Sequence, residues 1–175
     1  MPKLGIAIVG AGMIGAVHRR AALLAGADVR GVAASSPQRA HEAAQSWNVP
    51  RAYRDIEEVI ADPQVQVVHV CTPNHLHRAM AQAALEAGKH VICEKPLATT
   101  LDDAQALAAL AASTGLVATV PFVYRYHPVV REARARIAQG DLGPLHLIHG
   151  SYLQDWLLDP ASNNWRVDPA LGGTS

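Results

Sequence analysis

"LGIAIVGAGMIG" (residues 4–15) joins an apolar run of strand length to three closely spaced glycines. Between a strand and a helix, the spacing G-x-G-x-x-G lets the first glycine make a tight turn, the second admit a pyrophosphate against the backbone, and the third pack the helix on the strand. The stretch therefore predicts a strand, a phosphate-binding loop and a helix. The alternative is a tight strand–helix turn that binds no ligand. The residues expected to contact a dinucleotide are Gly10, Gly12, Met13, Ile14 and Gly15.

Four more apolar runs of strand length follow, at residues 28–34, 65–71, 90–93 and 116–120, and segments of helical periodicity separate them. Strands rich in Val and Ile that alternate with helices are typical of βαβ units, whose parallel sheet is covered by helices on both faces. We therefore expect an α/β fold with a Rossmann-type doubly wound parallel sheet. Local signals also mark the helix boundaries. The expected N-caps are Ser36, Asp55 and Thr100, and the expected C-terminal stops are Gly26, Gly88, Gly115 and Gly140.

The charges of the chain balance, with 15 Lys and Arg against 15 Asp and Glu among 175 residues. This balance gives no basic surface for nucleic acid or for an anionic membrane, so we expect neither partner. A charge-free stretch at 104–124 is interpreted as a soluble helix and a strand, because glycine and proline interrupt it. The two cysteines, Cys71 and Cys93, make no disulfide framework. We expect both to be reduced and buried, and the protein to be cytoplasmic.

The character of the sequence changes near residue 122. Residues 1–121 hold the predicted strands and helices of an NAD(P)-binding Rossmann domain. Residues 122–175 begin with an aromatic, basic loop, continue as a predicted helix at 128–139 and then as a longer predicted strand at 144–156. One strand cannot form a sheet alone. We therefore expect this segment to be a connecting helix and the truncated start of a second α/β domain.

The tip of the second predicted strand should carry an acid, about 20 residues after the glycines, if a carboxylate holds the adenosine ribose. The residues there are Ala33, Ala34, Ser35 and Ser36, and Arg39 follows them. Two hydroxyls beside an arginine suit a 2′-phosphate instead. We therefore predict NADP or NAD as the cofactor, with a slight preference for NADP, held by Ser35, Ser36 and Arg39. In the alternative interpretation Ser36 is only a helix cap.

Ligands of an open α/β sheet lie outside the carboxyl ends of its strands. Two polar segments are predicted at these ends, "CTPNHLH" (71–77) and "EKP" (94–96), and the Lys95–Pro96 peptide bond is a candidate for the cis form. An ammonium group beside a nicotinamide can donate a hydrogen bond to a substrate hydroxyl or carbonyl, so Lys95 is the predicted catalytic residue. The alternative for Lys95 is an exposed loop charge. The expected cofactor contacts are Thr72, Pro73, Asn74, His77, Glu94 and Lys95.

The same segment could also suggest a metal site or a nucleophilic cysteine. His75 and His77 are two residues apart at a predicted helix start, so they point to different faces, and no further cluster of ligands follows. We therefore expect no metal site. Neither Cys71 nor Cys93 has an evident base partner, so we expect both thiols to pack at strand ends rather than to act as nucleophiles.

Five blocks, GAGMIG, CTPNHLH, GKHVICEKPLA, YRYHP and NWRVDPALGG, occur in this order along the whole chain. In order and spacing they resemble the glucose–fructose oxidoreductase, inositol dehydrogenase and MocA (Gfo/Idh/MocA) family. The resemblance implies a hydride transfer between a nicotinamide cofactor and a sugar, polyol or related hydroxy compound, usually in a dimer or tetramer. It implies that Lys95 orients the substrate hydroxyl and that Glu94 helps to place the nicotinamide ribose. The implied residues near the nicotinamide and the substrate mouth are Tyr124, Arg125, Tyr126, Trp165 and Arg166.

The family's catalytic Asp-x-x-x-His pattern follows the glycine run, whereas this chain ends at Gly172-Gly173-Thr174-Ser175. The resemblance therefore implies that the general-base histidine lies beyond residue 175, and we expect the chain alone to bind cofactor but to turn over poorly. Two other functions stay open. One is a non-catalytic dinucleotide-binding module that serves as a redox sensor or subunit, and the other is a Rossmann-like methyltransferase with a different adenosyl cofactor.

Overall fold

Strand β1 (Gly5–Val9), the glycine loop and helix α1 (Met13–Leu24) form the first unit of a computed structural model that describes residues 3–155, 157–159, 161 and 165–169. Every residue of β1 is buried, because this strand lies between β2 (Asp28–Ala33) and β4 (Val67–Val70). A strand that is buried on both faces reads as a continuous apolar run, which is how residues 4–10 look in the sequence.

Within the described residues, the sheet has six parallel strands in the order β3-β2-β1-β4-β5-β6. Strand β3 spans Arg51–Tyr53, β5 spans His90–Cys93 and β6 spans Ala118–Thr119. The chain moves outward from β1 to β3 and then crosses to β4 on the other side of β1. This reversal of strand order confirms the predicted Rossmann-type doubly wound sheet, and in such sheets the ligand crevice lies at the carboxyl ends of the strands that flank the reversal, here β1 and β4.

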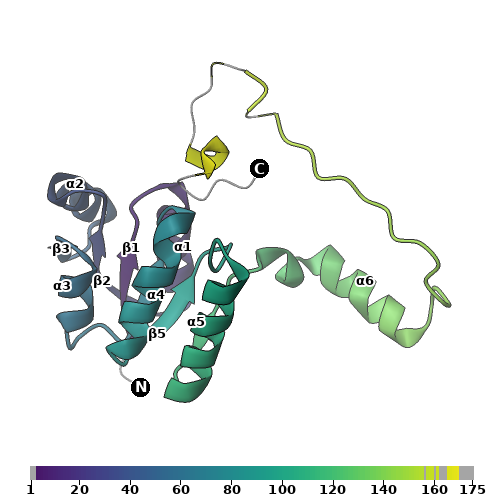
Figure 1. Ribbon diagram of the computed structural model, residues 1–175, viewed down its shortest axis with the longest axis horizontal. Helices are drawn as coiled ribbons and strands as arrows, with labels where there is room; N and C mark the ends of the chain where they lie inside the picture. The colour runs from purple at the N-terminus through teal and green to yellow at the C-terminus, as the bar shows by residue number, and fades with distance from the viewer. Residues whose placement is uncertain (1–2, 156, 160, 162–164, 170–175) are drawn as a thin grey trace.

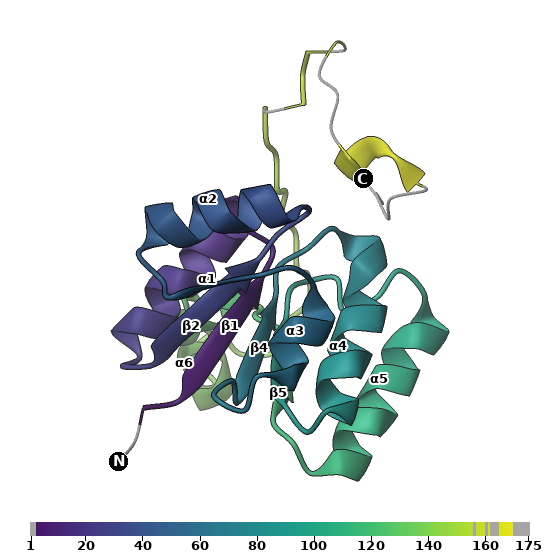
Figure 2. The same ribbon diagram turned by 90° about the vertical axis from the view of Figure 1, so that its left-hand side faces the viewer.

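Helices cover both faces of the sheet (Figure 2). Helices α1 and α2 (Pro37–Trp47) lie on one face, and α3 (Ile56–Ala61), α4 (His77–Glu86) and α5 (Leu101–Thr114) lie on the other. The strand residues alternate between these two layers, with Ile6 and Ile8 packed on the α1 side and Ala7 and Val9 on the α4 side. The alternation gives the molecule two apolar cores, one on each side of the sheet.

The predicted helix boundaries are confirmed by the hydrogen bonds at the helix ends. The Ser36 Oγ accepts from the backbone N–H of Arg39 at 3.3 Å, and the Asp55 Oδ1 accepts from that of Glu58 at 2.9 Å. The Thr100 Oγ1 accepts from the backbone N–H of Asp103 at 3.2 Å. The four stop glycines have positive φ angles of 67° to 83°, which an L side chain rarely adopts: Gly26, Gly88, Gly115 and Gly140.

Two strand predictions differ from the structure. Strand β3 was absent from the predicted runs, because its three residues "RAY" begin with an exposed arginine and alanine and only Tyr53 is buried. The predicted strand at 144–156 is irregular coil over residues 144–155, and Trp156 lies outside the described residues. The apolar pattern of 144–156 was correct for a strand, but a strand also needs a neighbour to receive its backbone hydrogen bonds, and the described residues supply none.

Helix α6 (Pro128–Gln139) projects away from the sheet, after a short turn η2 (Val123–Tyr126) (Figure 1). Large apolar side chains are exposed along this part of the chain, including Val129, Leu147, Ile148 and Leu153. None of the described helices is both long enough and apolar enough to cross a bilayer.

Candidate functional site

The glycine loop leaves side-chain space at one position and none at two others. Gly10 has a φ of +112°, and a Cβ there would lie 2.4 Å from the carbonyl oxygen of Cys71. A Cβ at Gly15 would lie 2.0 Å from the carbonyl oxygen of Gly10. By contrast, a Cβ at Gly12 would meet nothing within 4 Å. The protein itself therefore requires glycine at positions 10 and 15, whereas the open space at Gly12 faces away from the protein.

Helix α1 begins at this open position without a side chain to satisfy its first N–H groups. Its N-cap is Gly12, which makes no side-chain cap, and its first turn holds no acidic residue. Unpaired backbone N–H groups and the helix dipole make such an end favourable for an anion. Met13 and Ile14 follow in the first turn, and the Met13 side chain is exposed. The predicted phosphate loop is thus an open, uncapped helix start.

The predicted ribose residues lie together at the tip of β2. The guanidinium of Arg39 donates from Nη1 to the Ser35 Oγ at 3.4 Å, and Ser36 caps helix α2. Ser35 and Arg39 are exposed. The cap that was the alternative interpretation of Ser36 is therefore present, and its hydroxyl is already engaged with the backbone. A 2′-phosphate on Ser35 and Arg39 stays a prediction.

The two polar segments after β4 and β5 meet the glycine loop at one edge of the sheet. The backbone N–H of Cys71 donates to Val9 at 2.7 Å, and that of Glu94 donates to Val70 at 2.9 Å, so the ladder continues into both segments. The Lys95 side chain is exposed at this edge. The Lys95–Pro96 peptide bond is cis. Glu94 and Lys95 therefore emerge at the same edge of the sheet as Gly10, at the carboxyl ends of the strands.

His77 fastens the two segments to each other rather than facing solvent. It is 1% exposed, its Nδ1 lies 2.7 Å from the carbonyl oxygen of Pro96, and its Nε2 lies 2.8 Å from that of Thr72. The Thr72 hydroxyl donates to the Met80 sulfur at 3.6 Å, and Asn74 begins the turn η1 (Asn74–Leu76). His77 was one of the expected cofactor contacts, and that contact stays a prediction. In the structure its two ring nitrogens lie against carbonyl oxygens of both segments, so His77 holds the loops around the site together.

Glu94 is buried, 7% exposed, and belongs to a hydrogen-bonded chain of three side chains. The Nε2 of His18, in α1, lies 3.0 Å from the Glu94 Oε1, and the Nδ1 of His18 lies 3.1 Å from the Nδ1 of His69, in β4. The Glu94 Oε2 accepts from the backbone N–H of Lys95 at 3.1 Å. We call this cluster of His18, His69 and Glu94 the histidine–glutamate chain.

Sequence reasoning missed both histidines of this chain. His18 is on the buried face of α1, three residues after Gly15 and four before Ala22, and His69 interrupts the apolar strand "VVHV". A polar residue on a helix face with apolar spacing, or inside an apolar strand, is the signal that marks them, because a buried imidazole needs a partner.

Burial and hydrogen bonding act in opposite directions on these groups. Burial raises the pKa of the Glu94 carboxyl, but the hydrogen bonds from His18 and from the Lys95 backbone outweigh it and leave that pKa below its usual value. Burial, followed by the nearby His18, lowers the pKa of His69 from 6.5 to about 4. At neutral pH Glu94 is therefore an anion and His69 is neutral.

Both cysteines are buried free thiols, as expected. Burial and the Glu94 carboxylate raise the pKa of the Cys93 thiol to about 12, and burial also raises the pKa of Cys71. Neither forms a reactive thiolate at neutral pH. In the part of the chain that the structure describes, no group of three or more His, Cys, Asp or Glu residues could hold a metal ion.

The predicted substrate residues lie in the segment that follows β6. The guanidinium of Arg125 stacks on the Phe122 ring at 5.3 Å, and the Tyr124 hydroxyl lies 3.0 Å from that of Tyr152. Tyr126 is exposed in η2. Trp165 and Arg166 stack on each other at 4.5 Å in the turn η3 (Trp165–Val167). A role for these residues at a substrate mouth stays a prediction.

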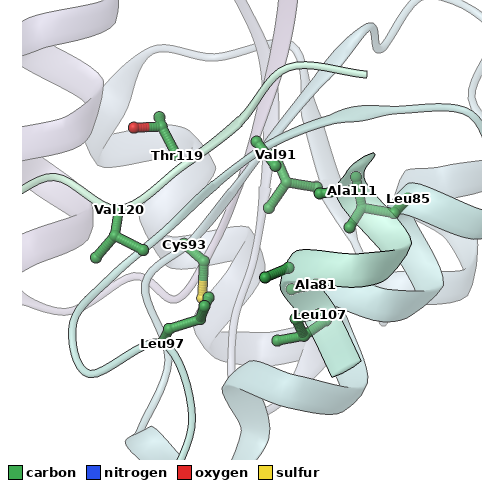
Figure 3. Close-up of a pocket in the computed structure, with 11 residues that line it drawn as sticks. Ala81, Leu85, Val91, Cys93, Leu97, Leu107, Ala111, Thr119 and Val120 are labelled. Atoms are coloured by element: carbon green, nitrogen blue, oxygen red, sulfur yellow. The ribbon is translucent and has the colours of Figure 1, made fainter. Parts of the chain in front are cut away.

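A cavity of about 170 Å³ lies elsewhere, between α4, α5, β5 and β6 (Figure 3). Its lining is apolar apart from Thr119 and the Cys93 thiol, and includes Leu85, Val91 and Leu107. Sugars and nucleotides need several convergent polar groups, which this lining does not supply. The cavity is a packing gap under the edge strand and is separate from the crevice.

Known proteins resemble the chain over most of its length. It is 37% identical over 184 residues to levoglucosan dehydrogenase of Pseudarthrobacter phenanthrenivorans, which covers 99% of this chain and 47% of that protein. It is 36% identical over 152 residues to 1,5-anhydro-D-fructose reductase of Ensifer adhaerens, covering 85% of this chain and 44% of the relative. The chain thus spans about half the length of the curated relatives it matches.

Solved structures agree with these relatives. Levoglucosan dehydrogenase in complex with NADH and levoglucosan superposes with a TM-score of 0.92 at 37% identity, covering 99% of this chain and 50% of that one. An inositol dehydrogenase homolog from Azotobacter vinelandii, complexed with NADH and myo-inositol, has a TM-score of 0.75 at 38% identity, covering 81% of this chain and 40% of that one.

Two family models match the chain in sequence order. The oxidoreductase family with an NAD-binding Rossmann fold matches residues 4–122, and the GFO/IDH/MocA C-terminal domain matches residues 130–175. The first match includes the glycine loop, both polar segments and the histidine–glutamate chain described above. The chain therefore belongs to the Gfo/Idh/MocA family of oxidoreductases.

Proposed function

We propose that this chain is part of an NAD(P)-dependent oxidoreductase that moves a hydride between the nicotinamide and a CH–OH group of a sugar, polyol or related hydroxy compound. The observation that carries the proposal is the open position at Gly12, where an uncapped helix start faces free space beside two glycines that the fold requires. Relatives of about 37% identity that are named as sugar or polyol dehydrogenases support the substrate class.

In this proposal the groups at the site have separate tasks. The backbone N–H groups of Gly12 and Met13 bind the pyrophosphate. The exposed ammonium of Lys95 donates a hydrogen bond to the reacting oxygen of the substrate and orients it. The bound nicotinamide accepts or supplies the hydride. The proton acceptor is assigned to a histidine in the half of the relatives' length that this chain does not span.

The cofactor choice within the proposal is NADP(H) over NAD(H). The tip of β2 carries no acid, and Ser35 and Arg39 form an exposed donor pair there. Relatives whose structures are named as NADH complexes make the opposite preference a real competitor. Titration of the chain with NADH and NADPH, followed by nicotinamide fluorescence, decides between them, and tighter binding of NADH overturns the preference.

The organisation of the protein is proposed from the distribution of burial. The buried apolar residues of the described chain lie between Ile6 and Leu107, whereas the large apolar side chains from Phe122 to Leu158 that the structure describes are mostly exposed. We assign residues 1–121 to the dinucleotide-binding domain and 122–175 to the start of the substrate domain. Exposed apolar surface on that part supports assembly into a homo-oligomer. Two reduced thiols support a cytoplasmic protein.

The test of the dinucleotide site is a pair of glycine substitutions. Gly12→Val should abolish NADH and NADPH binding, because its side chain fills the phosphate space, while the fold survives because nothing lies within 4 Å of the new Cβ. Gly150→Val is the matched control, since a Cβ there also meets nothing within 4 Å and lies far from the loop. Equal binding by both variants would contradict the proposed site.

The test of the reaction is turnover by the protein that contains the chain. Lys95→Met should lower kcat by about 10²-fold with little change in NAD(P)H affinity, because it removes one orienting hydrogen bond. An intact kcat in Lys95→Met rejects the role of Lys95. Cofactor binding without any turnover of sugars or polyols, in a protein that carries its second domain, favours a non-catalytic binding module instead.

A further inference from the structure

We propose that His18 and His69 are positioning residues for Glu94: the His69 ring holds His18 in one tautomer, and the Nε2–H of His18 then fixes the Glu94 carboxylate at the nicotinamide end of the crevice. The inference rests on the proposed function, because it takes Glu94 to face a bound dinucleotide. It adds two residues outside the glycine loop and the polar segments. They come from the buried face of α1 and from the middle of β4.

The hydrogen positions follow from a count of donors. The two Nδ1 atoms of His18 and His69 face each other at 3.1 Å, so a single hydrogen lies between them. The Nε2 of His69 is buried and has no hydrogen-bond partner among the described residues. A buried N–H without an acceptor is rarer and more costly than a lone pair without a donor. The hydrogen of His69 therefore belongs on its Nδ1.

The remaining hydrogen positions in the histidine–glutamate chain then follow. When the Nδ1–H of His69 donates to His18, the Nδ1 of His18 is an acceptor, so the ring hydrogen of His18 is on Nε2. That hydrogen points at the Glu94 Oε1, 3.0 Å away. A neutral His69 at neutral pH agrees with this arrangement, since its pKa is lowered to about 4, chiefly by burial. The three side chains form one directed set of hydrogen bonds that ends on the carboxylate.

His18 is the side-chain donor that the structure gives Glu94. The titratable and charged groups around the carboxylate are His18 from α1, His69 from β4, Cys71 just after β4, and Cys93 and Lys95 on either side of it in β5 and the following loop. Both thiols are neutral at neutral pH, because burial and Glu94 raise their pKa values. Lys95 contacts Glu94 through its backbone N–H. Among the described residues, loss of the His18 donor would leave the buried carboxylate with that one backbone hydrogen bond.

The first experiment reads the tautomers directly, without any cofactor. Nitrogen-15 NMR of the histidine side chains should show His18 with its hydrogen on Nε2 and His69 with its hydrogen on Nδ1. His69→Asn keeps an amide donor near the position of Nδ1 and should leave the His18 signals unchanged. His69→Leu removes the donor and should give a mixture of His18 tautomers. A wild-type His18 with its hydrogen on Nδ1 overturns the proposal whatever the variants do.

The second experiment reads the consequence for the carboxylate. His18→Leu should weaken NAD(P)H binding by about tenfold, the size expected for one hydrogen bond to a charged group, and should move the acid limb of the binding pH profile upward. His18→Gln keeps a donor near Nε2 and should restore most of the affinity and the pH profile. His146→Leu, a change at an exposed histidine remote from the site, is the matched control.

The outcomes separate the two proposals. A merely structural histidine would change the thermal unfolding midpoint of His18→Leu and His18→Gln alike, with no shift of the pH profile, and that result overturns the inference. Binding by His18→Leu equal to wild type overturns it as well. If wild-type protein binds neither NADH nor NADPH, the proposed function fails. The NMR measurement of the tautomers needs no cofactor, so it still tests the hydrogen bonds of the histidine–glutamate chain.

Discussion

Two buried carboxylates, Asp62 and Glu94, lie at opposite edges of the sheet, one before a strand and one after a strand. They differ in the groups that their hydrogen bonds reach. Asp62, 4% exposed, precedes β4. Its Oδ2 accepts from the Tyr53 hydroxyl at 2.7 Å and from the Arg51 guanidinium at 2.6 Å, and its Oδ1 accepts from the backbone of Gln64 at 2.8 Å. Both carboxylate oxygens therefore have partners, and the Arg51 side chain reaches solvent.

Glu94 is buried to a similar degree, and both of its oxygens also accept hydrogen bonds. Its hydrogen bonds run through His18 to His69, whose Nε2 has no partner among the described residues, and it lies next to the crevice. In both carboxyls the hydrogen bonds outweigh burial and lower the pKa, so both are anions at neutral pH. The two carboxylates are thus alike in burial and charge, and they differ in the groups at which their hydrogen bonds end.

The largest expected effect comes from removing the Asp62 carboxylate and the hydrogen bonds that it accepts. Asp62→Ala leaves the Tyr53 hydroxyl buried without its acceptor, so the free energy of unfolding should fall by about 3 kcal/mol, as for a buried ionic contact that loses one partner. Urea unfolding measures this. NAD(P)H affinity should stay unchanged at temperatures where the variant is folded, and a loss of affinity as large as that of a Glu94 variant would erase the distinction.

The next effect is the pH dependence that the neutral His69 gives to stability. The folded pKa of about 4 is below the ordinary value of 6.5, so the unfolded chain binds more protons between these values. His69 therefore contributes fully to stability above pH 6.5, and the contribution is lost as the pH falls toward 4. The loss amounts to at most about 3 kcal/mol.

Urea unfolding of wild type and His69→Leu at several pH values between 4 and 7 checks this prediction. The variant should show the smaller decline in the free energy of unfolding across that window. Parallel declines for the two proteins would mean that the pKa of His69 is the same in the folded and the unfolded chain, which contradicts the prediction.

A smaller effect sharpens the comparison at Glu94 itself. Glu94→Gln keeps the shape of the side chain but replaces one of its two acceptor oxygens with an NH2 group that faces a donor, so the free energy of unfolding should fall by about 1–2 kcal/mol. NAD(P)H affinity should fall by about tenfold, because hydrogen bonds to an anion are the stronger ones. Asp62→Asn is the matched control and should show the reverse ratio of the two effects.

The smallest effect concerns Arg39, an exposed charge at the same edge of the sheet. Arg39→Gln should weaken NADPH binding by about threefold and leave NADH binding unchanged, because solvent and salt screen an exposed ion pair. Fluorescence titrations at low and high salt test this, and the difference between the cofactors should shrink as salt rises. Equal loss for NADH and NADPH would show that Arg39 does not touch a 2′-phosphate.

The parts of the fold that sequence reasoning found are those with a strong local signal. Ser36, Asp55 and Thr100 cap the helices where they were expected, and the core strands follow the apolar runs. Strand β3 has only one buried residue, Tyr53, so its signal was too short to detect. The predicted strand at 144–156 had the right pattern, but pairing depends on a neighbour that no local pattern reveals.

The candidate site divides in the same way. Its glycines and the segments after β4 and β5 carry spacing and position in their own letters, and so they were predicted. His18 and His69 were not, because each looked like a single polar residue in an apolar element.

The sequence alone determined the glycine loop and the helix ends, since each depends on residues within a few positions of one another. It also determined the family, since the order and spacing of short blocks are read directly from the sequence. Only the tertiary structure brought together side chains that are 76 and 51 residues apart, His18 with Glu94 and His18 with His69. The physical reason is that these distances depend on the register of parallel strands and on how α1 lies across them, and both are set by packing of the whole core rather than by any short stretch.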